Sequence, residues 1–147
     1  MKKILALGSD HGGFKLKEYL KNYLTEKGFE IVDFGTDSDK SVDYPDFAHP
    51  LAKAVNDNKF ETGILVCGSG NGVNMVANKY PNIRAALCWN SEIAELARAH
   101  NNANILSLPG RFISFEEATK IVDLFLSTSF EGNRHQIRID KIKNNIC

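Results

Sequence analysis

The chain has 147 residues, enough for one domain with a hydrophobic core of its own, and we expect residues 1–147 to form a single domain. Its 18 Lys and Arg residues balance 18 Asp and Glu residues, so no overall field attracts nucleic acid or a membrane surface, and any anion site has to be local. The three cysteines show no paired spacing, which favours reduced thiols and a cytoplasmic location, and no two Cys or His residues stand at the spacing of zinc ligands. The apolar run at the N-terminus is too short for a signal peptide, and no run approaches the length of a membrane span.

Signals for strands and helices alternate along the chain. Short apolar runs predict five strands, at residues 4–7, 29–34, 64–66, 83–88 and 104–108. Helical spacing predicts helices from residue 14 to a stop at Gly28, at 47–58, from 73 after the central strand, from a cap at Ser91, from a capping box at Ser114 to Leu126, and at 133–144. Residues 35–46 are polar and predict a loop long enough to be functional. This alternation favours an α/β fold: a three-layer, doubly wound (Rossmann-like) sheet of five parallel strands with helices on both faces.

Polar residues follow three of the predicted strands. Asp10-His11 follows the first, Cys67-Gly68-Ser69 the central one, and Pro109-Gly110-Arg111 the last. Ligands of such sheets bind beyond the carboxyl ends of the strands. We therefore expect these three segments to meet at one edge of the sheet and to form the site.

Cys67 stands at the head of a glycine-rich turn, Gly68-Ser69-Gly70-Asn71-Gly72. Alternating glycines expose backbone N–H groups, which attract negative charge close to the start of a helix. A thiolate beside them is stabilised and could act as a base or a nucleophile. The alternative is a tight turn beside an inert buried cysteine, because so short a glycine pattern is a weak signal by itself.

The other candidate residues each have a structural interpretation as well. Asp10 could cap the helix that follows and His11 could be an exposed turn residue, while together they offer an acceptor for a hydroxyl and a donor for an anion. His100 lies at the end of a predicted helix, where it could be a dipole-matched cap or a general acid or base. Arg134 and Arg138 stand four residues apart on the last helix, so they share a face that could be a solvated surface or a phosphate clamp.

Seven motifs in one order together resemble the ribose-5-phosphate isomerase type B family, which includes the galactose-6-phosphate isomerase subunits. They cover about residues 3–142 and are Ser9-Asp10-His11-Gly12-Gly13-Phe14, Asp43-Tyr44-Pro45, Cys67-Gly68-Ser69-Gly70-Asn71-Gly72, Ala77-Asn78-Lys79, Arg84-Ala85-Ala86, Ala99-His100-Asn101-Asn102-Ala103-Asn104 and Arg134-His135-Gln136-Ile137-Arg138. The resemblance implies a cofactor-free and metal-free aldose–ketose isomerase that interconverts ribose 5-phosphate and ribulose 5-phosphate. Some members use a glutamate just after the glycine turn as the base, but Val73 occupies that place here, which favours the cysteine version.

The resemblance also implies residue roles. Cys67 would move a proton between C2 and C1 of the sugar, and His100 would protonate the ring oxygen during furanose opening, with Ser69 or Asp10 assisting. The remaining candidates would bind substrate: the turn from Gly68 to Gly72 (Gly68, Ser69, Gly70, Asn71 and Gly72) the enediolate oxygens, Tyr44 and Asn101 the sugar, and His11, Arg111, Arg134 and Arg138 the phosphate.

Family members are homodimers whose C-terminal helix reaches the partner's site, which implies a homodimer here, or a dimer of dimers, with composite active sites. Two alternatives stay open at this point. One is an isomerase of a hexose 6-phosphate, such as allose or galactose 6-phosphate. The other is a non-catalytic module that binds sugar phosphates.

Overall fold

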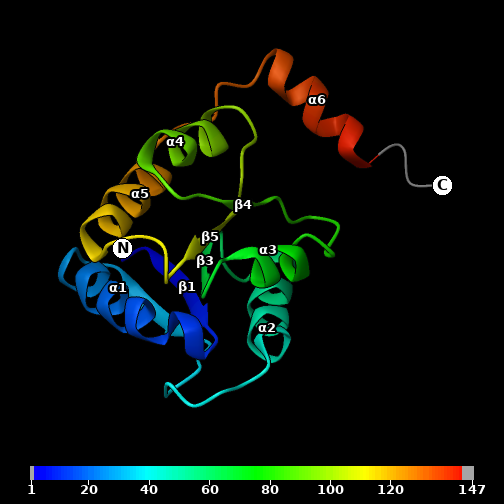
Figure 1. Ribbon diagram of the computed structural model, residues 1–147. Helices are drawn as coiled ribbons and strands as arrows, with labels where there is room; N and C mark the ends of the chain where they lie inside the picture. Colours follow the sequence, from blue (N-terminus) through cyan, green and yellow to red (C-terminus); the bar gives the residue numbers. More distant parts are fainter. Residues whose placement is uncertain (1, 144–147) are drawn as a thin grey trace.

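A computed structural model describes residues 2–143 and contains a five-stranded sheet in which every pair of neighbours is parallel (Figure 1). The strands are β1 (Ile4–Ser9), β2 (Glu30–Asp33), β3 (Gly63–Cys67), β4 (Ala85–Leu87) and β5 (Ile105–Pro109), and their order across the sheet is β2-β1-β3-β5-β4. The predicted doubly wound α/β fold is therefore confirmed.

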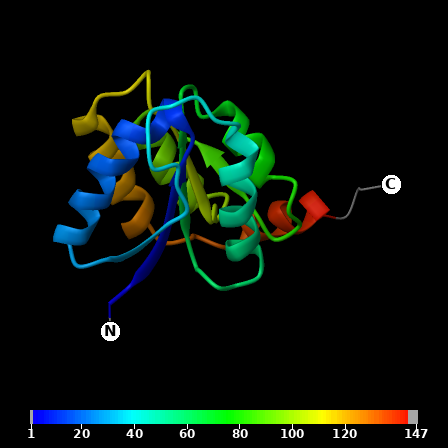
Figure 2. The same cartoon turned by 90° about the horizontal axis from the view of Figure 1, so that it is seen from below.

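Helices cover both faces of the sheet. They are a 3-10 turn η1 (His11–Gly13), α1 (Phe14–Glu26), α2 (Tyr44–Asn56), α3 (Asn71–Ala77), α4 (Ser91–Ala99), α5 (Phe115–Ser127) and α6 (Arg134–Lys143). Figure 2 shows α1 and α5 on one face and α2 and α3 on the other. Side chains of β3 alternate between the faces, so that Ile64 and Val66 join the core under α1, α4 and α5, whereas Leu65 and Cys67 join the core under α2 and α3.

The strand order reverses direction between β1 and β3, which is where ligands bind in open α/β sheets. Ser9 is level with Val66, and Cys67 is level with Pro109, so β1, β3 and β5 end at the same edge. The three polar segments that follow these strands therefore meet there, as the sequence predicts.

Several element boundaries differ from the prediction. α2 begins at Tyr44 rather than at residue 47, because Pro45 occupies a first-turn position that needs no donor. The cap of α4 is Asn90, whose side chain accepts the N–H of Ile93, and Ser91 is the first helical residue. Ser114 caps α5 as expected, but the carboxylate of Glu117 accepts the N–H of Ser91 instead of completing a reciprocal capping box.

Other differences are small. β4 is shorter than the predicted strand at 83–88, and the predicted end of the last helix at residue 144 lies outside the described residues. No helix among residues 2–143 is long and apolar enough to cross a membrane.

A buried ion pair fixes the end of β2. Lys17 on α1 is fully buried, with its Nζ 2.7 Å from Oδ2 of Asp33 and 2.9 Å from Oε1 of Glu18. Partial burial by itself raises the pKa of Asp33, but hydrogen bonds donated by Lys17, the N–H of Gly35 and Lys21 outweigh it and hold this pKa below its usual value. The connection from β2 to α2, residues 34–43, therefore starts from a fixed position.

Candidate active site

Cys67 closes β3 and is 5% exposed. The backbone N–H of Gly70 donates to its Sγ over 3.1 Å, which stabilises negative charge on the sulfur. Gly70 has a φ of 78°, and a side chain there would collide with Leu87 and with the backbone of Leu108. Only glycine therefore fits the turn that aims this N–H at the thiol.

The same turn carries free donors. Among residues 2–143, no acceptor is found for the backbone N–H of Gly68 or of Ser69. The Oγ of Ser69 accepts from the backbone and side chain of Asn71, over 3.3 and 3.2 Å, which fixes its position at the mouth of the turn. Unpaired N–H groups beside a thiol are suited to an anionic oxygen that forms during a reaction.

Asp10 and His11 follow β1 at the same edge. Asp10 is 7% exposed, and its Oδ1 accepts the N–H of Gly13 over 3.1 Å, so the capping interpretation is correct for this residue. The Nδ1 of His11 accepts the N–H of Val42 over 3.1 Å. A neutral ring whose Nδ1 accepts carries its proton on Nε2, and His11 can therefore donate from Nε2 to an anion.

Arg111 follows β5 and lies against the glycine turn. Its Nη1 is 3.1 Å from the point that a Cβ on Gly68 would occupy, and its N–H donates to the carbonyl of Gly68 over 3.0 Å. A cavity of about 360 Å³ opens beside it, lined by His11, Gly12, Lys15, Leu16, Asp39, Gly110, Arg111 and Phe115. Three cationic or donor side chains thus face one cavity in a chain without net charge.

Tyr44, the first residue of α2, lies over Gly72: a Cβ on Gly72 would be 2.7 Å from Cζ of the tyrosine ring. We call this group at the carboxyl ends of the strands the rim. It consists of Asp10, His11, Tyr44, Cys67, Gly68, Ser69, Gly70, Asn71, Gly72 and Arg111.

His100 and Asn101 do not belong to the rim. α4 starts after β4, at the rim edge, and runs back antiparallel to the strands, so its C-cap His100 lies at the opposite edge. The N–H of Gly63, at the start of β3, donates to the carbonyl of Asn104, and the side chain of Arg84 donates to the carbonyl of Asn101 there. β3 alone separates the two edges by about 13 Å, so within one chain His100 cannot reach a sugar held at Cys67.

His100 instead stacks on His135, the second residue of α6. The ring centroids are 4.2 Å apart, and the rings are inclined by 12°. Oε2 of Glu131 lies 3.2 Å from Nε2 of His135 and 3.7 Å from Nε2 of His100. Desolvation, the nearby Arg134 and His100 lower the pKa of His135, so its ring is neutral at neutral pH.

These three residues are also the group within the described part of the chain whose donor atoms are close enough to hold a metal ion, within 4.8 Å of one another. Imidazole binds metals in the plane of its ring. The rings of His100 and His135 lie in nearly parallel planes, which do not meet at a common ion, so the observed arrangement is a stack rather than a chelate.

Arg134 and Arg138 are exposed on α6, and no hydrogen bond or ion pair joins either side chain to another described residue. Figure 1 shows α6 at the periphery, well away from the sheet. We call His100, Asn101, Glu131, Arg134, His135 and Arg138 the far edge. One chain therefore presents the predicted site residues as two separate groups.

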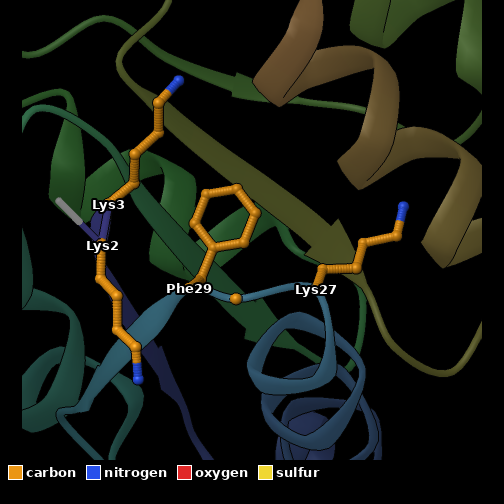
Figure 3. A pocket seen from close by; sticks show the side chains of 5 residues that line it. Lys2, Lys3, Lys27 and Phe29 are labelled. Carbon is orange, nitrogen blue, oxygen red and sulfur yellow. The ribbon is translucent and has the colours of Figure 1, made fainter.

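Two other features lie outside these groups. Cys88 is fully buried, which raises the pKa of its thiol to about 12, so it is not a nucleophile. A hollow of about 370 Å³ between Lys2, Lys3, Lys27 and Phe29 is shown in Figure 3. It lies where β1 and β2 begin, at the edge opposite to Cys67, and shares no residue with the rim.

Sequence reasoning missed Lys15, which lines the cavity beside the rim, and gave no role to Glu131 and His135 at the far edge. Lys15 follows Asp10-His11 by one helical turn, a spacing that could have placed it at the rim. His135 is one residue from Arg134, but its contact with His100 depends on how the connection after α5 folds.

Comparison with known proteins assigns the chain to a family. The family described as Ribose/Galactose Isomerase matches residues 5–142. The chain belongs to this family. Within the Ribose/Galactose Isomerase family, it is 44% identical over 142 residues to ribose-5-phosphate isomerase B of Escherichia coli strain K12, covering 97% of this chain and 95% of the relative.

Solved structures of this isomerase family have the same fold. A ribose 5-phosphate isomerase of Thermotoga maritima superposes with a TM-score of 0.95 at 53% identity, covering 98% of this chain and 99% of the other. Ribose-5-phosphate isomerase B of Mycoplasma genitalium, solved with bound ribulose 5-phosphate, gives a TM-score of 0.93 at 46% identity, covering 98% and 96%.

Proposed function

We propose that this chain is an aldose–ketose isomerase that interconverts ribose 5-phosphate and ribulose 5-phosphate. The observation that carries the proposal is the rim: a buried thiol beside free backbone donors, next to a cavity with the cations Lys15 and Arg111 and the donor His11. Family membership and relatives named for this reaction support it.

The rim supplies a base and a place for the charge that the base creates. The Cys67 thiolate takes the proton from C2 of the open-chain aldose and returns it to C1, through a cis-enediolate. The backbone N–H groups of Gly68 and Ser69 stabilise the enediolate oxygens as an oxyanion hole does. The reaction moves protons within one molecule without net oxidation, so the proposed mechanism needs no cofactor and no metal.

Contacts with the phosphate group of the substrate orient the sugar. The Nε2–H of His11 and the guanidinium of Arg111 donate to phosphate oxygens in the cavity beside the glycine turn. Tyr44, which lies over Gly72, and Asn71, which donates to Ser69, contact the sugar in this proposal. The phosphate contacts are remote from C1 and C2, so their binding energy positions the reacting carbons over Cys67.

Ring opening needs a proton donor, and His100 takes this role from a second copy of the chain. The separation of His100 from Cys67 within one chain supports a homodimer in which the partner's His100, Asn101, Arg134 and Arg138 complete each rim. Large apolar side chains are exposed on α3, after β4 and on α6, with Met75 65% exposed, Trp89 54% and Ile137 60%. Exposed apolar groups of this kind are typical of a surface that a partner covers.

A substrate panel tests the function. The purified protein is assayed without added metal for isomerisation of ribose 5-phosphate, allose 6-phosphate and galactose 6-phosphate, and we expect the pentose to be preferred. Preference for a hexose would keep the mechanism and overturn the substrate. No turnover of any of the three would favour a module that only binds sugar phosphates.

The assigned base has a matched control within the chain. Cys67→Ala is expected to lower kcat about 10³-fold, the range of a positioned general base. Cys88→Ala removes a thiol that is equally buried but unreactive, and should leave kcat unchanged. Full activity of Cys67→Ala would refute the assignment.

The proposal includes a cytoplasmic location, which rests only on the expectation that the cysteines are reduced.

A further inference from the structure

Glu131 and His135 form a structural unit with His100. The N–H of Glu131 donates to the carbonyl of Ala99 over 3.0 Å, which ties the connection after α5 to the last turn of α4. The N–H of His135 donates to the carbonyl of Gly132, just before α6. Together these two backbone hydrogen bonds hold Glu131 and His135 close to the end of α4, where His100 lies.

The two side chains constrain different degrees of freedom of the His100 ring. The His135 side chain is 6% exposed and supplies a flat face for stacking, which fixes the plane of the His100 ring, whose side chain is 38% exposed. The carboxylate of Glu131 lies between the two Nε2 atoms and fixes which ring edge points toward it.

His135 is poorly suited to be a mere packing residue. Its Nε2 is buried, and among the described residues it has no aligned hydrogen-bond partner, although Glu131 is close. An unsatisfied buried nitrogen costs free energy that an apolar side chain would avoid. A polar ring kept there at such a cost indicates a role in the chemistry of its neighbours.

We propose that Glu131 and His135 are positioning residues that hold the His100 ring for proton transfer to the furanose ring oxygen of a sugar bound at the partner's rim. This inference rests on the proposed function. In the step concerned, the C1–O4 bond breaks and its electron pair goes to O4, which takes the proton from His100. The C1 hydroxyl gives its proton to Asp10, and its oxygen becomes the aldehyde oxygen.

The charged and titratable groups around His100 include Glu131 in the connection and Arg134 and His135 on α6. Arg84 donates to the carbonyl of the neighbouring Asn101. A neutral His135 lets a charged His100 stack on it without repulsion between like charges. Glu131 offers the negative charge that a protonated ring prefers beside it.

Ring opening can be separated from the proton transfer at carbon by the choice of substrate. Ribose 5-phosphate is mostly a closed furanose and needs both steps. Ribulose 5-phosphate cannot close to a furanose because its O5 carries the phosphate. In deuterium oxide, exchange of the C1 hydrogen of ribulose 5-phosphate therefore reports on Cys67 without ring opening.

The experiment measures both readouts for Glu131→Gln and for His135→Leu, which removes the flat ring, with Gln136→Ala as the control on the same exposed part of α6. Both substitutions nearly keep side-chain volume, and Glu131 is half exposed, so that Glu131→Gln tests the proposal even where the buried variant unfolds. We expect kcat for ribose 5-phosphate to fall about tenfold to a hundredfold with little change in KM, while deuterium exchange stays within about twofold of wild type. Glu131→Asp should recover part of the loss.

A parallel loss of both readouts would mean a structural role and would overturn the proposal, as would unchanged turnover of ribose 5-phosphate. Wild-type protein that neither turns over ribose 5-phosphate nor exchanges the C1 hydrogen of ribulose 5-phosphate would instead contradict the proposed function itself. The two failures are therefore distinguishable.

Discussion

The rim and the far edge carry the candidate residues on different kinds of scaffold. Rim residues follow β1, β3 and β5, which lie in the middle of a sheet with buried residues on both faces. Far-edge residues lie at the end of α4, in the connection after α5 and on α6, a peripheral helix with two exposed arginines. In the proposed mechanism the rim binds the phosphate and holds the base, whereas the far edge contributes a proton donor and cations. The difference suggests that each needs the other from a second copy.

The largest expected effect of a phosphate contact lies at the rim. Arg111→Ala removes the guanidinium beside Gly68 and should lower kcat/KM for ribose 5-phosphate about a hundredfold, because a charge-assisted contact is worth about 3 kcal/mol. Steady-state kinetics at saturating and limiting substrate measure the change. An Arg111→Ala variant with unaltered kcat/KM would place the phosphate elsewhere.

A smaller effect is expected at the far edge. Arg138→Ala should lower kcat/KM about tenfold, because a contact across an exposed interface is more strongly screened by solvent. Lys141→Ala, which removes a like charge from the same helix, is the matched control. Equal losses in both variants would mean that the general charge of α6 matters, and not the position of Arg138.

The smallest effect concerns stability near the rim. The pKa of Asp33 in the folded protein is held below its usual value of about 3.8. The ion pair with Lys17 therefore stabilises the fold fully above about pH 3.8. This stabilisation is lost as the pH falls through the lower pKa of the folded state. Asp33→Asn should therefore flatten the decrease of Tm below about pH 4. Thermal unfolding between pH 6 and pH 3 measures it, and an equally steep decrease in the variant would contradict the assignment.

The sequence predicts the rim better than the far edge. Apolar runs followed by Asp10, Cys67 and Arg111 predict one common edge because parallel strands end together, and the register confirms this arrangement. The place of His100 could also be predicted, since a helix that follows a parallel strand runs back to the opposite edge. Its stacking on His135 could not, because that contact depends on the tertiary path between α5 and α6.

Helix starts were the least predictable boundaries. Ser91 is a good capping residue, yet Asn90 takes the role, because either side chain can accept an N–H of the first turn and only the backbone path decides between them.

Complementation between two inactive variants tests the central claim most directly. Cys67→Ala and His100→Ala proteins are purified separately, mixed under conditions that exchange subunits, and assayed with ribose 5-phosphate. If Cys67 and His100 act across a dimer, each mixed dimer has one intact site, so about a quarter of wild-type activity should return at equal mixing. Activity that stays at the level of the separate variants, although subunit exchange is verified, would contradict a site shared between two copies.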